Sequence, residues 1–157
     1  MSAAHRSRQT PPAPTEPVIE FFPGAEDLPF ATIMVDLLRT NLADHPHKRG
    51  DFAAMRGRVA LVAEDVGLAI TLRFQGGRLS VHRGLYGIPD LVVRGPSSAL
   101  IDLSRLPPHP RLRFLPDVGS EVASALITAL RERSLRIHGL LGHIALGLRF
   151  ARVLSIY

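Results

Sequence analysis

The sequence has 157 residues, of which 46% are hydrophobic, and its mean hydropathy is +0.14. A chain of this size and composition can bury one core of its own, which excludes a wholly disordered protein. The 19 basic and 14 acidic residues give a formal net charge of +5, and cysteine and tryptophan are absent. Disulfide frameworks, thiolate catalysis and cysteine-based zinc sites are therefore excluded. No apolar run reaches the roughly 20 residues of a membrane-spanning helix, and we expect a cytoplasmic protein.

The N-terminal segment differs in composition from the rest of the chain. Pro11, Pro12, Pro14 and Pro17 lie among Ala, Thr and Glu residues, which favours extended, polyproline-like conformations. The first ten residues are polar and basic with no apolar stretch behind them, unlike a secretory signal. We predict a disordered proline-rich tail over residues 1–17 and a single domain over residues 18–157.

Apolar residues recur at helical spacing in several segments. The first predicted helix begins near Asp27, with Pro29 in its first turn, and it ends before Pro46. A short helix follows as far as Met55. Three later helices are predicted: from about Ser98 to Ser104, after Ser120, whose hydroxyl can cap the helix, and from about Leu140 to Leu154.

The middle of the chain changes to the period of two that is typical of β-strands. Two such stretches are joined by Gln75-Gly76-Gly77, which supplies a hairpin turn. With the stretches around Val59 and Asp90 to Arg94, four strands with short connections favour an antiparallel sheet, and Leu135 to His138 is a predicted fifth strand. The alternation predicts that Leu68, Ile70, Leu72, Phe74, Leu79 and Val81 face the helices, and that Thr71, Arg73, Ser80 and His82 face solvent.

Residues with catalytic or metal-binding patterns are scarce. The seven histidines include the close pair His45 and His47, but no third ligand is placed near them by the sequence. The motifs of P-loop, dinucleotide-binding and serine-hydrolase sites are absent, and no carboxylate pair has a spacing that indicates acid–base catalysis. We therefore expect a protein that is not an enzyme and that uses no metal and no cofactor.

The basic residues are mostly arginine and are spread along the chain. Their densest cluster is Arg111, Arg113, Arg131, Arg133 and Arg136. No aromatic residues are interleaved with them as in RNA-binding sheets, so nucleic-acid binding is not expected. A transient contact with an anionic membrane surface is one interpretation of this charge, and codon bias towards arginine is the other.

The predicted last helix is apolar on nearly all sides. Only His143, Arg149, Arg152 and Ser155 interrupt it. Such a helix needs cover on most of its surface. It is therefore either a central core helix or dimer interface, or one wall of an apolar cavity, and the residues alone do not separate these interpretations.

The order of these elements resembles the sterol carrier protein-2 family of lipid-binding domains. The resemblance also includes bacterial accessory proteins of ubiquinone synthesis that use this domain, and it covers roughly residues 30–154. Four stretches carry it: Met55 to Val62, Leu68 to Val81, Pro89 to Gly95 with Leu100 to Leu103, and Leu135 to Gly139 with Ile144 to Leu148.

The resemblance implies an α+β fold with about five mostly antiparallel strands and helices packed over one face. It further implies an apolar tunnel between sheet and helices that carries a sterol, a fatty acyl chain or an isoprenoid or quinone intermediate without catalysis. The candidate lipid-binding residues are Ile33, Leu37, Leu72, Phe74, Val81, Leu126, Ile144 and Leu148.

A second interpretation keeps the fold but not the ligand. The core would then be filled, and the domain would act as an interaction or accessory module in a multiprotein complex such as one of quinone biosynthesis, or as a homodimer. The Pro- and Arg-rich segment Leu106 to Ser134 favours this alternative, because it could occupy the tunnel. The apolar last helix favours the lipid carrier.

Overall fold

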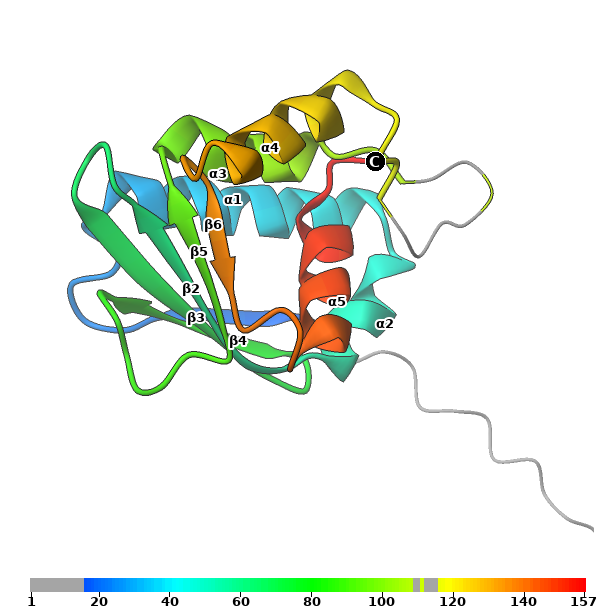
Figure 1. Cartoon of the computed structure of the whole chain (residues 1–157). Coiled ribbons are helices and arrows are strands. Elements are labelled where there is room, and N and C mark those ends of the chain that lie inside the picture. Colours follow the sequence, from blue (N-terminus) through cyan, green and yellow to red (C-terminus); the bar gives the residue numbers. More distant parts are fainter. Residues whose placement is uncertain (1–15, 109–110, 112–115) are drawn as a thin grey trace, which may run out of the picture.

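The computed structural model describes residues 16–108, 111 and 116–157, so most of the predicted tail lies outside the described residues. The described chain forms an α+β fold around one six-stranded sheet (Figure 1). Its strands are β1 (Val18–Phe21), β2 (Arg56–Ala63), β3 (Leu68–Gln75), β4 (Arg78–Arg83), β5 (Leu91–Gly95) and β6 (Arg136–His138). Its helices are α1 (Pro29–Asp44), α2 (Lys48–Ala54), α3 (Ser97–Asp102), α4 (Glu121–Arg131) and α5 (Ile144–Leu154), with a 3-10 turn η1 (Leu103–Arg105).

The sheet has the order β1-β4-β3-β2-β5-β6. Strands β2, β3 and β4 form the predicted antiparallel meander, and β6 pairs antiparallel with β5. However, β5 pairs parallel with β2, and β1 pairs parallel with β4. The sheet has six strands, one more than the five predicted, and the additional strand is β1.

Strand β1 was missed because its pattern is too short to show a period. It has four residues, which alternate between exposed and half-buried, and it follows a proline-rich segment. Its pairing depends on a distant part of the chain, since Ile19 lies opposite Leu79 in β4. Strand β5 lies beside β2 because residues 84–90 connect the end of β4 to β5 across β3 and β2.

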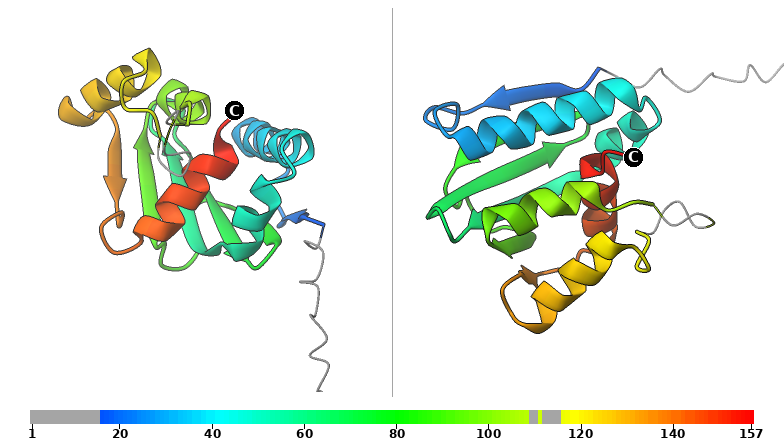
Figure 2. Two further views of the ribbon diagram at one scale, coloured as in Figure 1. Left: turned by 90° about the vertical axis from the view of Figure 1, so that its right-hand side faces the viewer. Right: turned by 90° about the horizontal axis from the view of Figure 1, so that it is seen from above.

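One face of the sheet, called the inner face below, packs against helices. Figure 2 shows α1, α3 and α5 on this side of the strands. Met34 and Leu38 of α1 and Phe150 of α5 join the strand residues in one buried cluster. The prediction for the inner face is confirmed for five of its six residues, which are fully buried, and Leu68 is half-buried against the same core; the five are Ile70, Leu72, Phe74, Leu79 and Val81.

The opposite, outer face of the sheet is more covered than its polar residues indicate. Thr71, Ser80 and His82 are buried, so their predicted exposure was wrong, while Arg73 is half-buried. The crossing segment 84–90 covers Thr71 and His82. Tyr86 in this segment stacks on the His82 ring, with centroids 3.9 Å apart, and Phe22 covers the other side of the imidazole at 4.2 Å. The pKa of His82 is lowered below its usual value, mainly because the imidazole is buried. The nearby positive charges of Arg73 and Arg58 lower it further.

The helices follow their predicted positions closely. Helix α1 begins at Pro29 and ends at Asp44, and the Ser120 hydroxyl caps α4 by accepting the Ala123 N–H at 3.1 Å. The last helix begins at Ile144, four residues later than predicted, because Gly139 has a φ of +85° and residues 139–143 form a turn. Within the described ranges, no helix combines the length and apolarity needed to cross a membrane.

Candidate functional site

A cavity of about 500 Å³ opens between α2, α5 and the segment after η1. Apolar side chains make most of its wall, and a few charged groups stand along one side. Its lining residues are His47, Lys48, Asp51, Leu106, Pro107, Pro108, Pro116, Leu148, Ala151, Arg152, Ser155 and Tyr157.

The wall on the α5 side is held by polar side chains of α1 and α2. The buried Asn41 amide donates to the backbone carbonyls of Val153 at 3.2 Å and Leu154 at 2.6 Å. The Lys48 ammonium donates to the Ser155 carbonyl. These groups satisfy the carbonyls at the end of a helix, which have no partner within the helix. They fix where α5 ends and therefore where the cavity wall stands.

The chain beyond α5 is tied to the segment that forms the opposite wall. The Ser155 hydroxyl donates to the Leu106 carbonyl at 2.8 Å, and the Ile156 N–H donates to the Ser104 carbonyl at 2.8 Å. An isolated bridge joins Pro108 to Pro116 and brings both prolines to the cavity. Proline has no N–H to leave unsatisfied, so these residues present an apolar wall at little polar cost.

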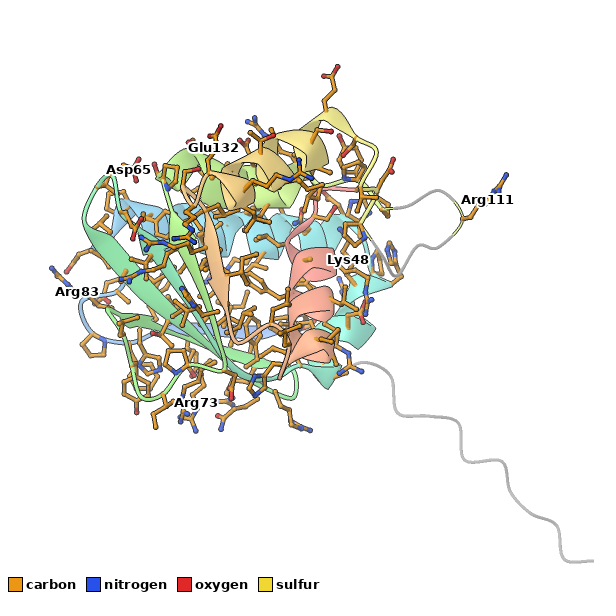
Figure 3. The ribbon with its side chains drawn as sticks, viewed as in Figure 1. Lys48, Asp65, Arg73, Arg83, Arg111 and Glu132 are labelled. Carbon is orange, nitrogen blue, oxygen red and sulfur yellow. The ribbon has the colours of Figure 1, made fainter. Side chains whose placement is uncertain are left out.

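The charged side of the cavity is an ion pair between α2 and α5. Asp51 accepts two hydrogen bonds from Arg152, at 2.9 Å to Nε and 2.6 Å to Nη2. Arg149 approaches the same carboxylate at 3.9 Å. Figure 3 shows Lys48 beside α5, and burial lowers the pKa of its ammonium below the ordinary value of 10.5. The cavity therefore combines an apolar wall with a fixed polar rim.

The predicted lipid-binding residues are divided among four environments. Leu148 lines the cavity, while Ile33 and Ile144 are about half exposed on the surface. Leu37 is half-buried against the core. The remaining four are packed inside the core cluster: Leu72, Phe74, Val81 and Leu126.

For most residues that line the cavity, no pattern in the sequence indicates a role in a binding site. Lys48 and Asp51 are single charged residues on a short helix, and Tyr157 lies beyond the last apolar stretch. The sequence does indicate that the Pro- and Arg-rich segment Leu106 to Ser134 could occupy the tunnel. Its described residues Leu106 to Pro108 and Pro116 line the cavity, and α4 follows them. No group of three His, Cys, Asp or Glu side chains that could hold a metal ion occurs among the described residues.

The titration of Lys48 can be measured directly, because it is the only lysine in the sequence. We expect its pKa to be lower in the folded than in the unfolded chain. The unfolded chain then binds more protons, so the free energy of unfolding rises with pH in the range just below the ordinary value of 10.5. NMR of the lysine ε-carbon gives the pKa, and Lys48→Met should abolish that part of the rise. An ordinary pKa in the folded protein would contradict the burial of the ammonium group.

Comparisons with known proteins extend this description of the fold. No protein-family model matches the sequence, and a comparison with curated proteins finds no match. Among solved structures, a UbiJ-SCP2 ubiquinone synthesis protein is similar at 15% identity and a TM-score of 0.54, over 80% of this chain and 91% of that one. A crystal structure of sterol carrier protein 2 is similar at 13% identity and a TM-score of 0.48, over 81% and 95%. The chain therefore has the α+β fold of the UbiJ-SCP2 ubiquinone synthesis protein.

Proposed function

We propose that the protein binds and carries an apolar lipid without catalysing a reaction. The observation that carries this proposal is the cavity of about 500 Å³ with its mainly apolar wall. Its size lies within the range of small-molecule sites, which are concave and mostly apolar with a few placed polar groups. Removing the apolar surface of a ligand from water yields roughly 25 cal/mol per Å², so contact with this wall favours binding.

The distribution of polar groups supports an amphiphile over a ligand that is apolar throughout. Leu106, Pro107 and Leu148 would contact the hydrocarbon part of the ligand. The Asp51–Arg152 pair stands on the rim, where a hydroxyl, carboxyl or quinone oxygen would find a donor or acceptor. A sterol, a fatty acyl chain and an isoprenoid or quinone intermediate all combine a hydrocarbon part with a polar oxygen-containing group. The quinone intermediate gains support from the similarity to a ubiquinone synthesis protein.

The inner face of the sheet is already covered by packed side chains, which leaves the cavity beside α5 as the candidate ligand site. Leu72, Phe74 and Val81 are at most 1% exposed and belong to the closed core cluster. The same filled core is the observation that favours the alternative, an interaction module that holds no lipid. The two proposals differ in whether the cavity is occupied in the cell.

Native mass spectrometry of the protein purified without detergent tests this proposal. We expect a population with added lipid mass, and organic extraction of the same sample should release an amphiphile. A fluorescent fatty acid should bind a separate sample of the folded protein, freed of lipid without organic solvent, with a saturable signal. Protein that carries no lipid and binds neither a fluorescent fatty acid nor a fluorescent sterol would contradict the carrier and leave the interaction module.

A further inference from the structure

Two neighbouring loops at one end of the molecule expose large aliphatic side chains. Ile88 lies in the crossing segment 84–90 and is 85% exposed, and Leu141 in the turn before α5 is 93% exposed. The carboxylate of Asp90 connects the two loops, because its Oδ2 accepts the Arg58 N–H at 2.7 Å and its Oδ1 lies 3.3 Å from His143 Nε2. Figure 1 shows both loops at the lower end of the fold, where β6 leads into α5 and β4 into β5.

The crossing segment is anchored, so the exposure of Ile88 is built into the fold. The Thr71 hydroxyl donates to the Gly84 carbonyl at 2.8 Å and accepts the Tyr86 N–H at 2.9 Å. The Tyr86 ring is stacked on His82. These contacts hold the segment against the sheet while Leu85 and Ile88 project from it, at 60% and 85% exposure.

Three arginines lie on the outer face of the sheet at the same end. Arg58 in β2 and Arg73 in β3 are direct cross-strand neighbours, an arrangement in which like charges destabilise the pair. With Arg56 they line a hollow of about 290 Å³ that also includes Gly57, Phe74 and Gln75. In Figure 3 the Arg73 side chain points away from the ribbon at this end.

These arginines lack acidic partners within the described residues. The ion pairs of the sheet belong to other arginines, namely Arg78 with Glu20, and Arg94 and Arg136 with Glu64. The Arg58 Nε is buried and has no hydrogen-bond partner. An oxyanion in the hollow would relieve the repulsion between the neighbouring guanidinium groups.

We propose that this end of the molecule, called the loop–arginine surface, docks on membranes that contain anionic phospholipids. Ile88 and Leu141 would enter the boundary between headgroups and acyl chains, and Arg56, Arg58 and Arg73 would bind lipid phosphates. Apolar side chains on projecting loops beside basic groups are the combination that interfacial membrane binding uses. The surface shares no residue with the cavity, so this proposal stands independently of the lipid-carrier proposal.

Two other occupants fit the surface less well. A second copy of the chain, related by a two-fold axis, would bring the same arginines against one another. Single-stranded nucleic acid binds through stacking on aromatic rings, whereas the projecting residues here are aliphatic and the Tyr86 ring is stacked on His82. The Arg111 to Arg136 cluster predicted from the sequence is a poorer candidate, because the Arg136 guanidinium is already paired with the Glu64 carboxylate.

Vesicle co-sedimentation tests the electrostatic half of the proposal. We expect the protein to bind vesicles of phosphatidylcholine with phosphatidylglycerol, to bind phosphatidylcholine alone weakly, and to be released by salt. Arg56→Gln and Arg73→Gln should each weaken binding about fivefold. Arg131→Gln is the matched control, because Arg131 is exposed on α4, away from this surface, and its loss should change binding little. Equal binding to neutral and anionic vesicles, or equal effects of Arg73→Gln and Arg131→Gln, would overturn the proposal.

Fluorescence tests the insertion half, because the sequence has no tryptophan. Ile88→Trp and Leu141→Trp each introduce a single reporter, and both should shift their emission to the blue when anionic vesicles are added. Val118→Trp is the matched control, because Val118 is also exposed, at 66%, and should show no shift. Absence of a shift at Ile88 and Leu141, or binding to an acidic polypeptide or RNA without binding to vesicles, would overturn the assignment to a membrane.

Discussion

Ala151→Phe is expected to fill the cavity and to weaken the binding of a fluorescent fatty acid by about tenfold. Ala151 lies on the cavity wall in α5, next to the Asp51–Arg152 pair. If the added ring displaces about 60 Å² of buried ligand surface, the loss at roughly 25 cal/mol per Å² is about 1.5 kcal/mol, or about tenfold in Kd. Titration of the variant with the same fatty acid measures the change.

Ala125→Phe is the control for this variant. Ala125 is exposed on α4, so the same added ring should leave both the affinity and the melting temperature close to those of the parent protein. If Ala151→Phe binds the fatty acid as tightly as Ala125→Phe does, the ligand does not lie in this cavity.

Phe74→Ala is expected to lower the free energy of unfolding by about 3–5 kcal/mol, the usual cost of removing a buried phenylalanine. Phe74 is 1% exposed and packs edge-to-face against Phe52, with ring centroids 5.9 Å apart, and against Phe150 at 6.1 Å. Such aromatic contacts add to the burial energy of the ring. Urea denaturation of the variant and the parent protein measures the difference.

Leu148→Ala provides the comparison for the core variant. Leu148 is half-buried on the cavity wall, so its truncation should cost less stability than Phe74→Ala and should change the affinity for lipid. A strongly destabilised Leu148→Ala variant in a protein that binds no lipid would assign this residue to a filled core and would favour the interaction module.

The sequence predicted the inner face of the sheet well because that pattern repeats within a short stretch. Leu72, Phe74, Leu79 and Val81 alternate across the Gly76-Gly77 turn, and a shift by one residue would expose all of them. Strand β1 lacked such support, since its four residues acquire a structure only by pairing with β4. A pattern predicts an element when the element is long enough to show it.

Burial of the outer face could not be predicted from the strands themselves. His82 and Thr71 alternate as solvent-facing residues would, but they are covered by Tyr86 from the segment that crosses β3 and β2 on its way from β4 to β5. The cavity could not be predicted for the same reason: it is formed by contacts between separate parts of the chain, which contribute Lys48, Leu106 and Leu148. Leu148 was among the candidates because apolar helix faces have a period, whereas a single lysine or proline has none.

The hydrogen bonds from Asn41 to the end of α5 also have a consequence for folding kinetics. They join residues 112 and 113 positions apart, whereas the β2–β3 hairpin joins neighbouring segments. The entropy cost of closing a loop grows with its length, so short-range contacts form before long-range ones. We therefore expect α5 to dock in the late steps of folding. Before α5 docks, the cavity wall is incomplete, and the apolar faces of α1 and α5 are uncovered and can contact other chains.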